Sequence, residues 1–259
     1  MPLTYADTFR HSDMLNPIST RTLLSAGRLA RLGPRKTLLD LGSGKGFPSL
    51  FWASTFGIKV LGFDINRNYV EYANSRARLL NLKHQVEYRC RDIRQLGVGH
   101  KYEALASLGV GIVGVYGNVQ KALESFRCSI KLGGFLFLAE PVWLTRPVPE
   151  KLQKELGIGE THFCTKEEMK ELLQDCGFQV TGLFVSAKDD WESYVRPVYS
   201  AMQEIAKNRP ELSRESRKMT QSFRAEYRAA GISWDMVLWV AKTRARERAQ
   251  SNVTWFKSD

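Results

Sequence analysis

Short apolar runs alternate along the chain with longer segments whose apolar residues recur every three or four positions. Thr37–Leu41, Val60–Asp64 and Val86–Cys90 are runs of the first kind, and segments 47–56 and 67–80 lie between them. Runs of about four to eight apolar residues are typical of buried strands, and the longer spacing is typical of helices. Strands that alternate with helices predict βαβ units and a parallel sheet.

The same pattern continues through the rest of the chain. Further strands are predicted at 102–108, 135–139, 178–186 and 233–241, and further helices at 21–32, 118–130, 166–176, 190–207 and 212–230. Residues 1–17 show neither pattern and are expected to be irregular. We therefore predict an α/β fold with a Rossmann-like, seven-stranded, mostly parallel sheet, helices on both faces and a helical insertion before the last strand.

The length suits one domain with an insertion, because single domains commonly run to about 200–250 residues. We expect one domain over residues 1–243, with its core at about 18–187. The two helices at about 188–232 are expected to form a lid over one edge of the sheet. Residues 244–259 are polar and basic and are expected to be a disordered tail.

Three alternate glycines follow the first predicted strand. Asp40 ends the strand and Gly42, Gly44 and Gly46 come directly after it, before the next helix. Glycine lets a ligand approach the backbone closely, and the N–H groups at a helix N-terminus can then contact it. The spacing is not the G-x-G-x-x-G of dinucleotide sites, because Phe47 occupies the third glycine position. An acid beside the turn favours a ligand with positive charge.

Two more strands also end in acids. Asp64 ends the second strand, where an acid reaches the ribose hydroxyls of a bound nucleoside, and Asp92 follows the third. The whole pattern resembles the class I S-adenosylmethionine (SAM)-dependent methyltransferases, whose motif I is D-x-G-x-G-x-G. The resemblance implies SAM as the cofactor and covers residues 18–187. It implies cofactor contacts by Asp40, Gly42, Ser43, Gly44, Gly46, Asp64, Ile65, Asn66, Asp92, Ile93, Ser107, Leu108 and Gly109.

The end of the fifth predicted strand bears on the substrate. Leu132-Gly133-Gly134, an apolar strand and Glu140-Pro-Val-Trp143 are similar to the small-molecule branch of the family, near the quinone-biosynthesis methyltransferases. The fourth strand lacks the Asn/Asp-Pro-Pro-aromatic string of enzymes that methylate amino groups of nucleic acids. These features favour a small-molecule acceptor.

Few residues are candidates for the chemistry itself. A nucleophile with a proton to lose benefits from a base, and Glu140, at a strand end, and His11, in the N-terminal segment, are the candidates that we name. Trp143, Trp191 and Tyr194 are expected to line the acceptor site, although aromatic residues on such helices are more often plain core. No clustered ligand pattern suggests a metal, and we predict none.

Composition leaves two other functions open. Net charge is +11, and residues 1–100 alone carry 15 Lys and Arg against 7 Asp and Glu. Such an excess suits RNA, so a tRNA or rRNA methyltransferase is the first alternative. A non-catalytic SAM-binding protein is the second. No signal peptide or apolar run long enough for a membrane span is visible, and the four scattered cysteines favour a reducing cytoplasm.

Overall fold

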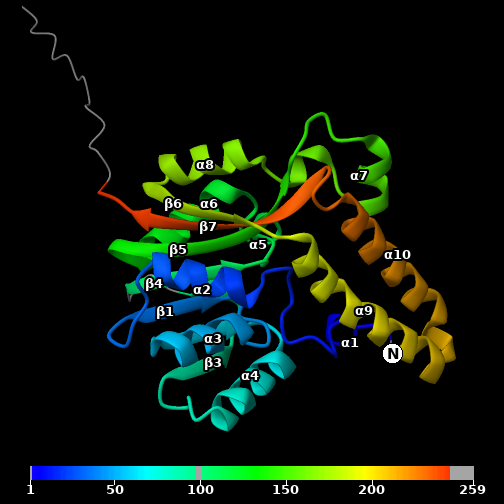
Figure 1. Ribbon diagram of the computed structural model, residues 1–259, viewed down its shortest axis with the longest axis horizontal. Coiled ribbons are helices and arrows are strands. Elements are labelled where there is room, and N and C mark those ends of the chain that lie inside the picture. The colour runs from blue at the N-terminus through cyan, green and yellow to red at the C-terminus, as the bar shows by residue number, and fades with distance from the viewer. Residues whose placement is uncertain (1, 97–100, 246–259) are drawn as a thin grey trace, which may run out of the picture.

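Seven strands form one central sheet in the computed structural model, which describes residues 2–96 and 101–245. Their order is β3-β2-β1-β4-β5-β7-β6 (Figure 1). All neighbours pair in parallel except β7, which runs antiparallel to both β5 and β6. The strands are β1 Thr37–Leu41, β2 Lys59–Asp64, β3 Val86–Cys90, β4 Tyr102–Leu108, β5 Ile130–Trp143, β6 Phe178–Val185 and β7 Trp234–Thr243.

Helices cover both faces of this sheet because its strands are apolar on both sides. One face packs against α2 (Thr20–Leu29), α3 (Phe47–Phe56) and α4 (Arg67–Leu79). The other packs against α5 (Ile112–Tyr116), α6 (Val119–Ser129) and α8 (Lys166–Asp175). Two separate apolar cores result, one on each side of the sheet, as expected for a parallel sheet buried on both faces.

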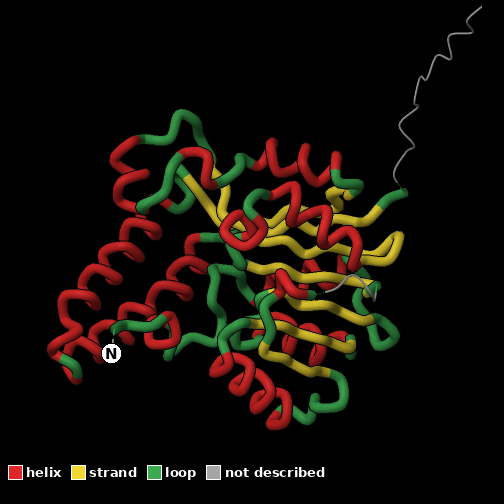
Figure 2. Tube along the Cα trace, turned by 180° about the vertical axis from the view of Figure 1, so that it is seen from behind, coloured by secondary structure: helices red, strands yellow, loops and turns green. Residues whose placement is uncertain are grey.

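A third core lies beside the sheet. Helices α9 (Lys188–Asn208) and α10 (Ser213–Ala229) pack against each other and against the short α1 (Tyr5–Thr8). They project to one side of the sheet in both views (Figures 1 and 2). We call these two helices the arm. The remaining elements are α7 Glu150–Leu156, η1 Ile93–Gln95, η2 Glu160–His162 and η3 Pro210–Leu212.

The predicted fold class is confirmed, and the element ends shift by only a few residues. Three helices were not predicted, namely α1, α5 and the short α7. Helix α1 begins at the capping pair Thr4 and Asp7, in a segment expected to be irregular, and α5 is too short to show a clear period. Strand β5 is longer than the predicted 135–139 because its end pairs with β7 as far as Trp143.

The arm occupies the predicted insertion between β6 and β7. Its role as a lid stays a prediction. The predicted tail lies almost entirely outside the described residues. Within the described part, no helix combines the length and the apolar character that crossing a membrane requires.

Candidate active site

A cleft of about 480 Å³ opens at the carboxyl ends of the strands, beside the point where the strand order reverses between β1 and β4. Open α/β sheets bind ligands at this place, and pockets of about 300–1,000 Å³ suit small molecules and cofactors. The loop after β2, the loop after β4 and the glycine turn all line the cleft. Nine predicted cofactor residues line it, namely Gly42, Gly44, Asp64, Ile65, Asn66, Asp92, Ile93, Leu108 and Gly109.

The glycine turn has the backbone that its spacing predicts. Gly42, Gly44 and Gly46 all have positive φ, at 66°, 53° and 75°. A Cβ on Gly46 would lie 2.7 Å from the ring of Tyr88, so a side chain is excluded there by packing as well as by conformation. The turn leads directly into α3, whose first residue is Phe47, so it lies at a helix N-terminus beside the cleft.

Asp64 joins the glycine turn to the loop after β2. Its Oδ2 accepts the Gly44 N–H at 2.7 Å and its Oδ1 accepts the Asn66 N–H at 2.8 Å. Asn66 in turn caps α4 by accepting from Asn68 and Tyr69. The carboxylate therefore fixes the shape of two loops and still lines the cleft, where a ribose hydroxyl would donate to it.

Several buried polar atoms next to the turn have no hydrogen-bond partner among the described residues. They are Asp40 Oδ2, Ser43 Oγ, Ser107 Oγ, Asn16 Oδ1 and Ser12 Oγ. Asp40, Ser43 and Asn16 line a narrow extension of about 30 Å³. Because buried polar groups are nearly always paired in folded proteins, this cluster fits a polar ligand group. Burial, with a smaller contribution from the nearby Asp64 carboxylate, raises the pKa of Asp40 to about 7 against the hydrogen bond from Ser49.

The third acid is held by a neighbour that the sequence analysis did not consider. Arg94 binds Asp92 through Nε at 3.0 Å and through a terminal nitrogen at 2.5 Å. This bond, followed by the Arg94 backbone N–H, lowers the pKa of Asp92. Ile65, Ile93 and Arg94 lie along the same part of the cleft, so an aromatic ring there would meet two apolar side chains and one charged pair.

Glu140 lies beneath the loop after β4 rather than in the cleft. Its Oε1 accepts the N–H groups of Gly111 at 3.2 Å and Ile112 at 3.3 Å, and its side chain is buried. Burial raises its pKa to about 8 against these hydrogen bonds. The predicted role as a base is therefore corrected to a positioning role, because the carboxyl faces the backbone of the loop that lines the cleft.

The segment 3–16, which we call the strap, crosses the glycine turn. Lys45, within the turn, is buried and donates from Nζ to the carbonyl oxygens of Phe9 at 2.8 Å and Ser12 at 2.7 Å. The ammonium also lies 5.1 Å from the centre of the Tyr72 ring. Burial lowers the pKa of Lys45. Lys45 therefore holds the strap against the glycine turn.

Two further contacts hold the strap against the cleft. The Asn16 Nδ2 donates to the Leu108 carbonyl oxygen at 3.0 Å, at the end of β4. The Tyr69 hydroxyl donates to the Tyr5 carbonyl oxygen at 3.2 Å. Since Tyr5 and Leu15 line the cleft, the strap forms part of its wall.

The structure does not bring His11 to the cleft. Its Nε2 lies 2.7 Å from a Glu204 oxygen of α9, and the side chain is 41% exposed. The predicted catalytic role is therefore corrected, because the imidazole faces the outside of the strap and pairs with the arm.

The two predicted substrate tryptophans are part of the core. Trp143 is fully buried and donates to the Glu160 carbonyl oxygen, and Trp191 is buried and donates to Asp235 at 2.8 Å. Both indoles are committed to internal partners, which corrects the predicted contact with substrate. Tyr194 is different, because it lines a separate cavity of about 230 Å³ with Met14, Asn16 and Asp190.

The sequence analysis did not name Lys45, Tyr5 or Leu15 as residues of the site. Lys45 stands at a variable position of the motif, and its partners are 33 and 36 residues away, so no local signal identifies it. A signal for α1 was present, since Thr4 and Asp7 form a capping box. In the described residues, no group of three or more His, Cys, Asp or Glu is arranged to hold a metal.

Comparisons with known proteins agree with this geometry. Residues 38–134 match the family described as "Methyltransferase domain". The uncharacterized protein YjhP of Escherichia coli K12 is 28% identical over 180 residues, which are 69% of this chain and 72% of that protein.

Solved structures share the fold over almost the whole chain. A SAM-dependent methyltransferase from Geobacter sulfurreducens in complex with S-adenosyl-L-homocysteine has a TM-score of 0.84 at 24% identity, covering 94% of this chain and 99% of that one. The E. coli YjhP structure has a TM-score of 0.83 at 22% identity, covering 92% and 98%. The class I methyltransferase fold is confirmed, and residues 38–134 match a methyltransferase domain, whereas the quinone-biosynthesis branch stays a prediction.

Proposed function

We propose that this chain, which carries a methyltransferase domain in the class I fold, binds SAM in the cleft and transfers its methyl group to a small-molecule acceptor in the cytoplasm. The observation that carries the proposal is the D-x-G-x-G-x-G turn, bonded through Gly44 to the acid that ends β2. The Geobacter and Thiobacillus structures with the same fold contain S-adenosyl-L-homocysteine.

The residues present fit the parts of SAM one by one. In this proposal Asp64 accepts from the ribose hydroxyls, and Asp92 with Ile65 and Ile93 contacts the adenine, since all four residues line the cleft. The unpaired oxygens of Asp40 and Ser43 are placed for the polar amino-acid end. A carboxylate near the positive ammonium and sulfonium groups adds a favourable charge interaction.

The acceptor is proposed to bind in the cavity of about 230 Å³ between the strap and α9. Met14 and Asn16 line both this cavity and the narrow extension of the cofactor cleft. Asn16 also contacts the Leu108 carbonyl, at the strand end where the reactive methyl is expected. A space of this size, with Asp190 and Tyr194 in its wall, fits a small polar molecule and not a folded macromolecule.

SAM supplies a methyl carbon on a positively charged sulfur, which departs as a neutral thioether when the acceptor forms its bond to that carbon. The chain mainly has to hold both reactants in line and exclude water, and such positioning supplies roughly 7–11 kcal/mol of the barrier. Glu140 holds the loop after β4, and Lys45 holds the strap. A proton on the acceptor leaves to solvent, since neither the Glu140 carboxyl nor the His11 imidazole faces the cleft.

Calorimetric titration with SAM and S-adenosylhomocysteine tests the cofactor, with NAD as the control ligand. Asp64→Ala is expected to weaken both affinities by about 1.5–3 kcal/mol, because it removes a charged acceptor. Glu87→Gln, an exposed carboxylate on the neighbouring strand, serves as the matched control and should bind normally. Wild-type affinity in Asp64→Ala, or binding of NAD alone, would contradict the proposal.

Turnover separates the enzyme from a non-catalytic SAM-binding protein. Release of S-adenosylhomocysteine is followed while small amines, phenols, thiols and carboxylic acids are offered as acceptors. Acceptor-dependent release supports the proposal, and tight cofactor binding without release by any acceptor would favour the non-catalytic alternative.

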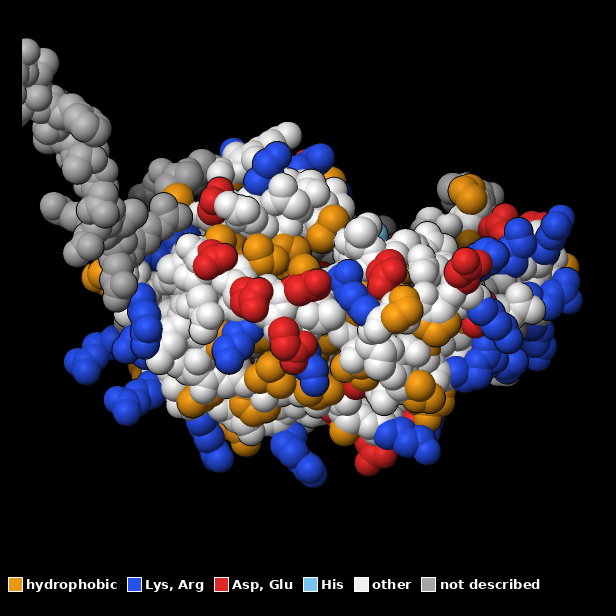
Figure 3. Space-filling model, turned by 90° about the horizontal axis from the view of Figure 1, so that it is seen from above, with side chains coloured by type: hydrophobic (Ala, Val, Ile, Leu, Met, Phe, Trp, Pro, Cys, Tyr) orange, Lys and Arg blue, Asp and Glu red, His pale blue; other side chains and the backbone are white. Residues whose placement is uncertain are grey.

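A second candidate is methylation of RNA, favoured by one observation. Figure 3 shows Lys and Arg gathered at the end of the molecule formed by the arm, where Arg214, Arg217, Lys218 and Arg224 of α10 are exposed. Phosphate contacts make binding fall with salt, by about 0.7 in log K per log salt for each contact with a single strand. Methylation of bulk tRNA or rRNA, with that salt dependence, would replace the small-molecule proposal.

A further inference from the structure

A further cavity, distinct from those already described, lies beside the strap. It has a volume of about 170 Å³ and opens between the strap, α3 and α4. One water needs about 10–15 Å³ of such space, so the cavity has room for roughly ten water-sized groups. A free amino acid with a large side chain is of this size.

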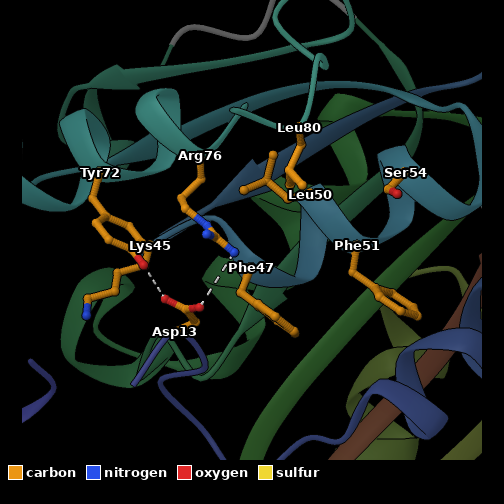
Figure 4. Close-up of a pocket in the computed structure, with 9 residues that line it drawn as sticks. All are labelled: Asp13, Lys45, Phe47, Leu50, Phe51, Ser54, Tyr72, Arg76 and Leu80. Atoms are coloured by element: carbon orange, nitrogen blue, oxygen red, sulfur yellow. Dashed lines mark hydrogen bonds and ion pairs between the residues drawn. The ribbon is translucent and has the colours of Figure 1, made fainter. Parts of the chain in front are cut away.

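The two ends of the cavity differ in chemistry (Figure 4). At one end Asp13, Tyr72 and Arg76 point toward one another. Toward the other end the walls are mostly apolar and consist of Phe47, Leu50, Phe51 and Leu80 together with Ser54. An occupant therefore needs a charged or polar head and an apolar body.

The polar end holds a carboxylate, Asp13, and a guanidinium, Arg76, in loose contact. The Tyr72 hydroxyl donates to Asp13 Oδ1 at 2.5 Å, whereas Arg76 reaches Asp13 Oδ2 only at 4.0 Å. That ion pair is looser than a hydrogen bond, so most of the five guanidinium N–H donors face other directions. Lys45 also lines the cavity and keeps its positive charge, but its buried ammonium already donates to two carbonyl oxygens, which leaves Arg76 as the cation with donors to spare.

A simple anion would be attracted by Arg76 and repelled by Asp13, and a simple cation would meet the reverse. A zwitterion satisfies both, since a carboxylate forms a two-pronged contact with a guanidinium and an ammonium pairs with a carboxylate. We propose that this cavity binds a free α-amino acid with a large apolar side chain, its carboxylate on Arg76, its ammonium on Asp13 and its side chain between Phe47, Phe51 and Leu80.

Occupation of this site is coupled to the cofactor cleft through the strap. Asp13 and Lys45 line both this cavity and the narrow extension that contains Asp40. An amino acid that holds Asp13 in place also holds the strap against the glycine turn. The amino acid therefore strengthens cofactor binding, and the cofactor strengthens amino-acid binding by the same factor.

Calorimetry on the full chain tests the site, with L-leucine, L-phenylalanine and L-methionine as probes. At least one of them binds. Three related compounds bind at least tenfold more weakly: N-acetyl-L-leucine lacks the ammonium, isoamylamine lacks the carboxylate and glycine lacks the side chain. Arg76→Gln lowers the affinity at least tenfold. Arg78→Gln, two positions along α4 and outside the cavity lining, leaves it unchanged.

The same titration is repeated with the protein saturated by S-adenosylhomocysteine, which separates this site from the cofactor cleft. Retained or strengthened binding supports a second site. Loss of amino-acid binding under saturation would mean that the probe occupies the cleft itself, and full affinity in Arg76→Gln would place it elsewhere. Either result, or no binding of any probe, overturns the proposal without bearing on cofactor binding, which is titrated separately.

Discussion

Asp40 shows at the scale of one residue how the fold prepares a site for a charged ligand. Its side chain is buried, one oxygen has no partner among the described residues, and burial raises its pKa to about 7. A carboxylate in this state costs free energy that a bound cation recovers. The unfavourable environment of Asp40 thus becomes a preference for a positively charged ligand.

The affinity for SAM should consequently depend on pH. A nearby cation stabilises the ionised carboxylate, so binding lowers the pKa of Asp40 and releases a proton wherever the free protein still holds it. We expect the affinity to rise about tenfold between pH 6 and pH 8 and then to level off, because one pKa unit corresponds to about 1.4 kcal/mol. Calorimetry at several pH values measures this rise.

Asp40→Asn should bind more weakly and lose the pH dependence. Asp92→Asn is the control, because the pKa of Asp92 is already lowered by Arg94 and its removal should leave the dependence intact. A flat profile in the wild type would show that no cation approaches Asp40.

Lys45 is the second residue whose replacement should change a property of the whole site, because it affects both stability and cofactor binding. Lys45→Met keeps most of the buried side-chain volume and leaves the carbonyl oxygens of Phe9 and Ser12 without a donor. We expect a loss of about 1–3 kcal/mol in the free energy of unfolding and weaker binding of S-adenosylhomocysteine. Urea unfolding and calorimetry measure the two effects. Lys59→Met, on the exposed end of β2, should change neither; a normal affinity in Lys45→Met would show that the strap is not needed for the cleft.

At the scale of elements, the arm and the strap depend on each other. Phe9 of the strap stacks on Tyr194 of α9 and meets Phe223 of α10 edge-on, with ring centres 5.8 Å apart in each case. Arg10 and His11 add contacts to Glu204 of α9. Helices α9 and α10, which are far along the chain from the glycine turn, therefore hold one wall of the cleft.

Phe223→Ala should loosen this assembly. Removing a buried phenylalanine costs about 3–5 kcal/mol, and here the loss falls on the core shared by the arm and the strap. We expect hydrogen exchange to accelerate in segment 3–16 before it does so in β1 or β4. Phe126→Ala removes an equally buried ring from the opposite core, so it controls for lost stability. Equal acceleration in both variants would mean that the arm does not hold the strap.

At the scale of the whole molecule, several buried carboxyls make the fold sensitive to pH. Burial raises the pKa of Asp40 to about 7, of Glu140 to about 8 and of Glu226 to about 7. Each group keeps its proton in the folded chain at pH values where the unfolded chain has lost it. Between an ordinary carboxyl pKa, near 4, and these raised values the folded state binds more protons, so stability falls as pH rises.

Glu140→Gln should remove part of this fall. The amide oxygen still accepts from Gly111 and Ile112, and no ionised group remains to be desolvated. We expect the variant to gain about 1 kcal/mol per pH unit over the wild type between pH 5 and pH 8, measured by urea unfolding. Glu124→Gln, on the exposed face of α6, should follow the wild type. Parallel curves for Glu140→Gln and wild type would show that Glu140 is ionised in the fold.

The sequence by itself determined the sheet and the outline of the cofactor site. Alternating apolar runs and helical periods are repeated, local signals, and they placed all seven strands within a few residues. The glycines and the acids Asp40, Asp64 and Asp92 belong to strand ends, and parallel strands bring their carboxyl ends to one edge. Their meeting around one cleft followed from the strand pattern alone.

The tertiary structure decided which side chains face that cleft. Glu140 lies near the end of β5 and His11 lies in the strap. The Glu140 carboxyl faces a backbone loop, whereas the His11 imidazole faces Glu204. Trp143 and Lys45 likewise take partners that the local pattern does not specify. A strand end fixes where a residue lies, but its side-chain direction depends on partners far along the chain, whose arrangement no local periodicity encodes.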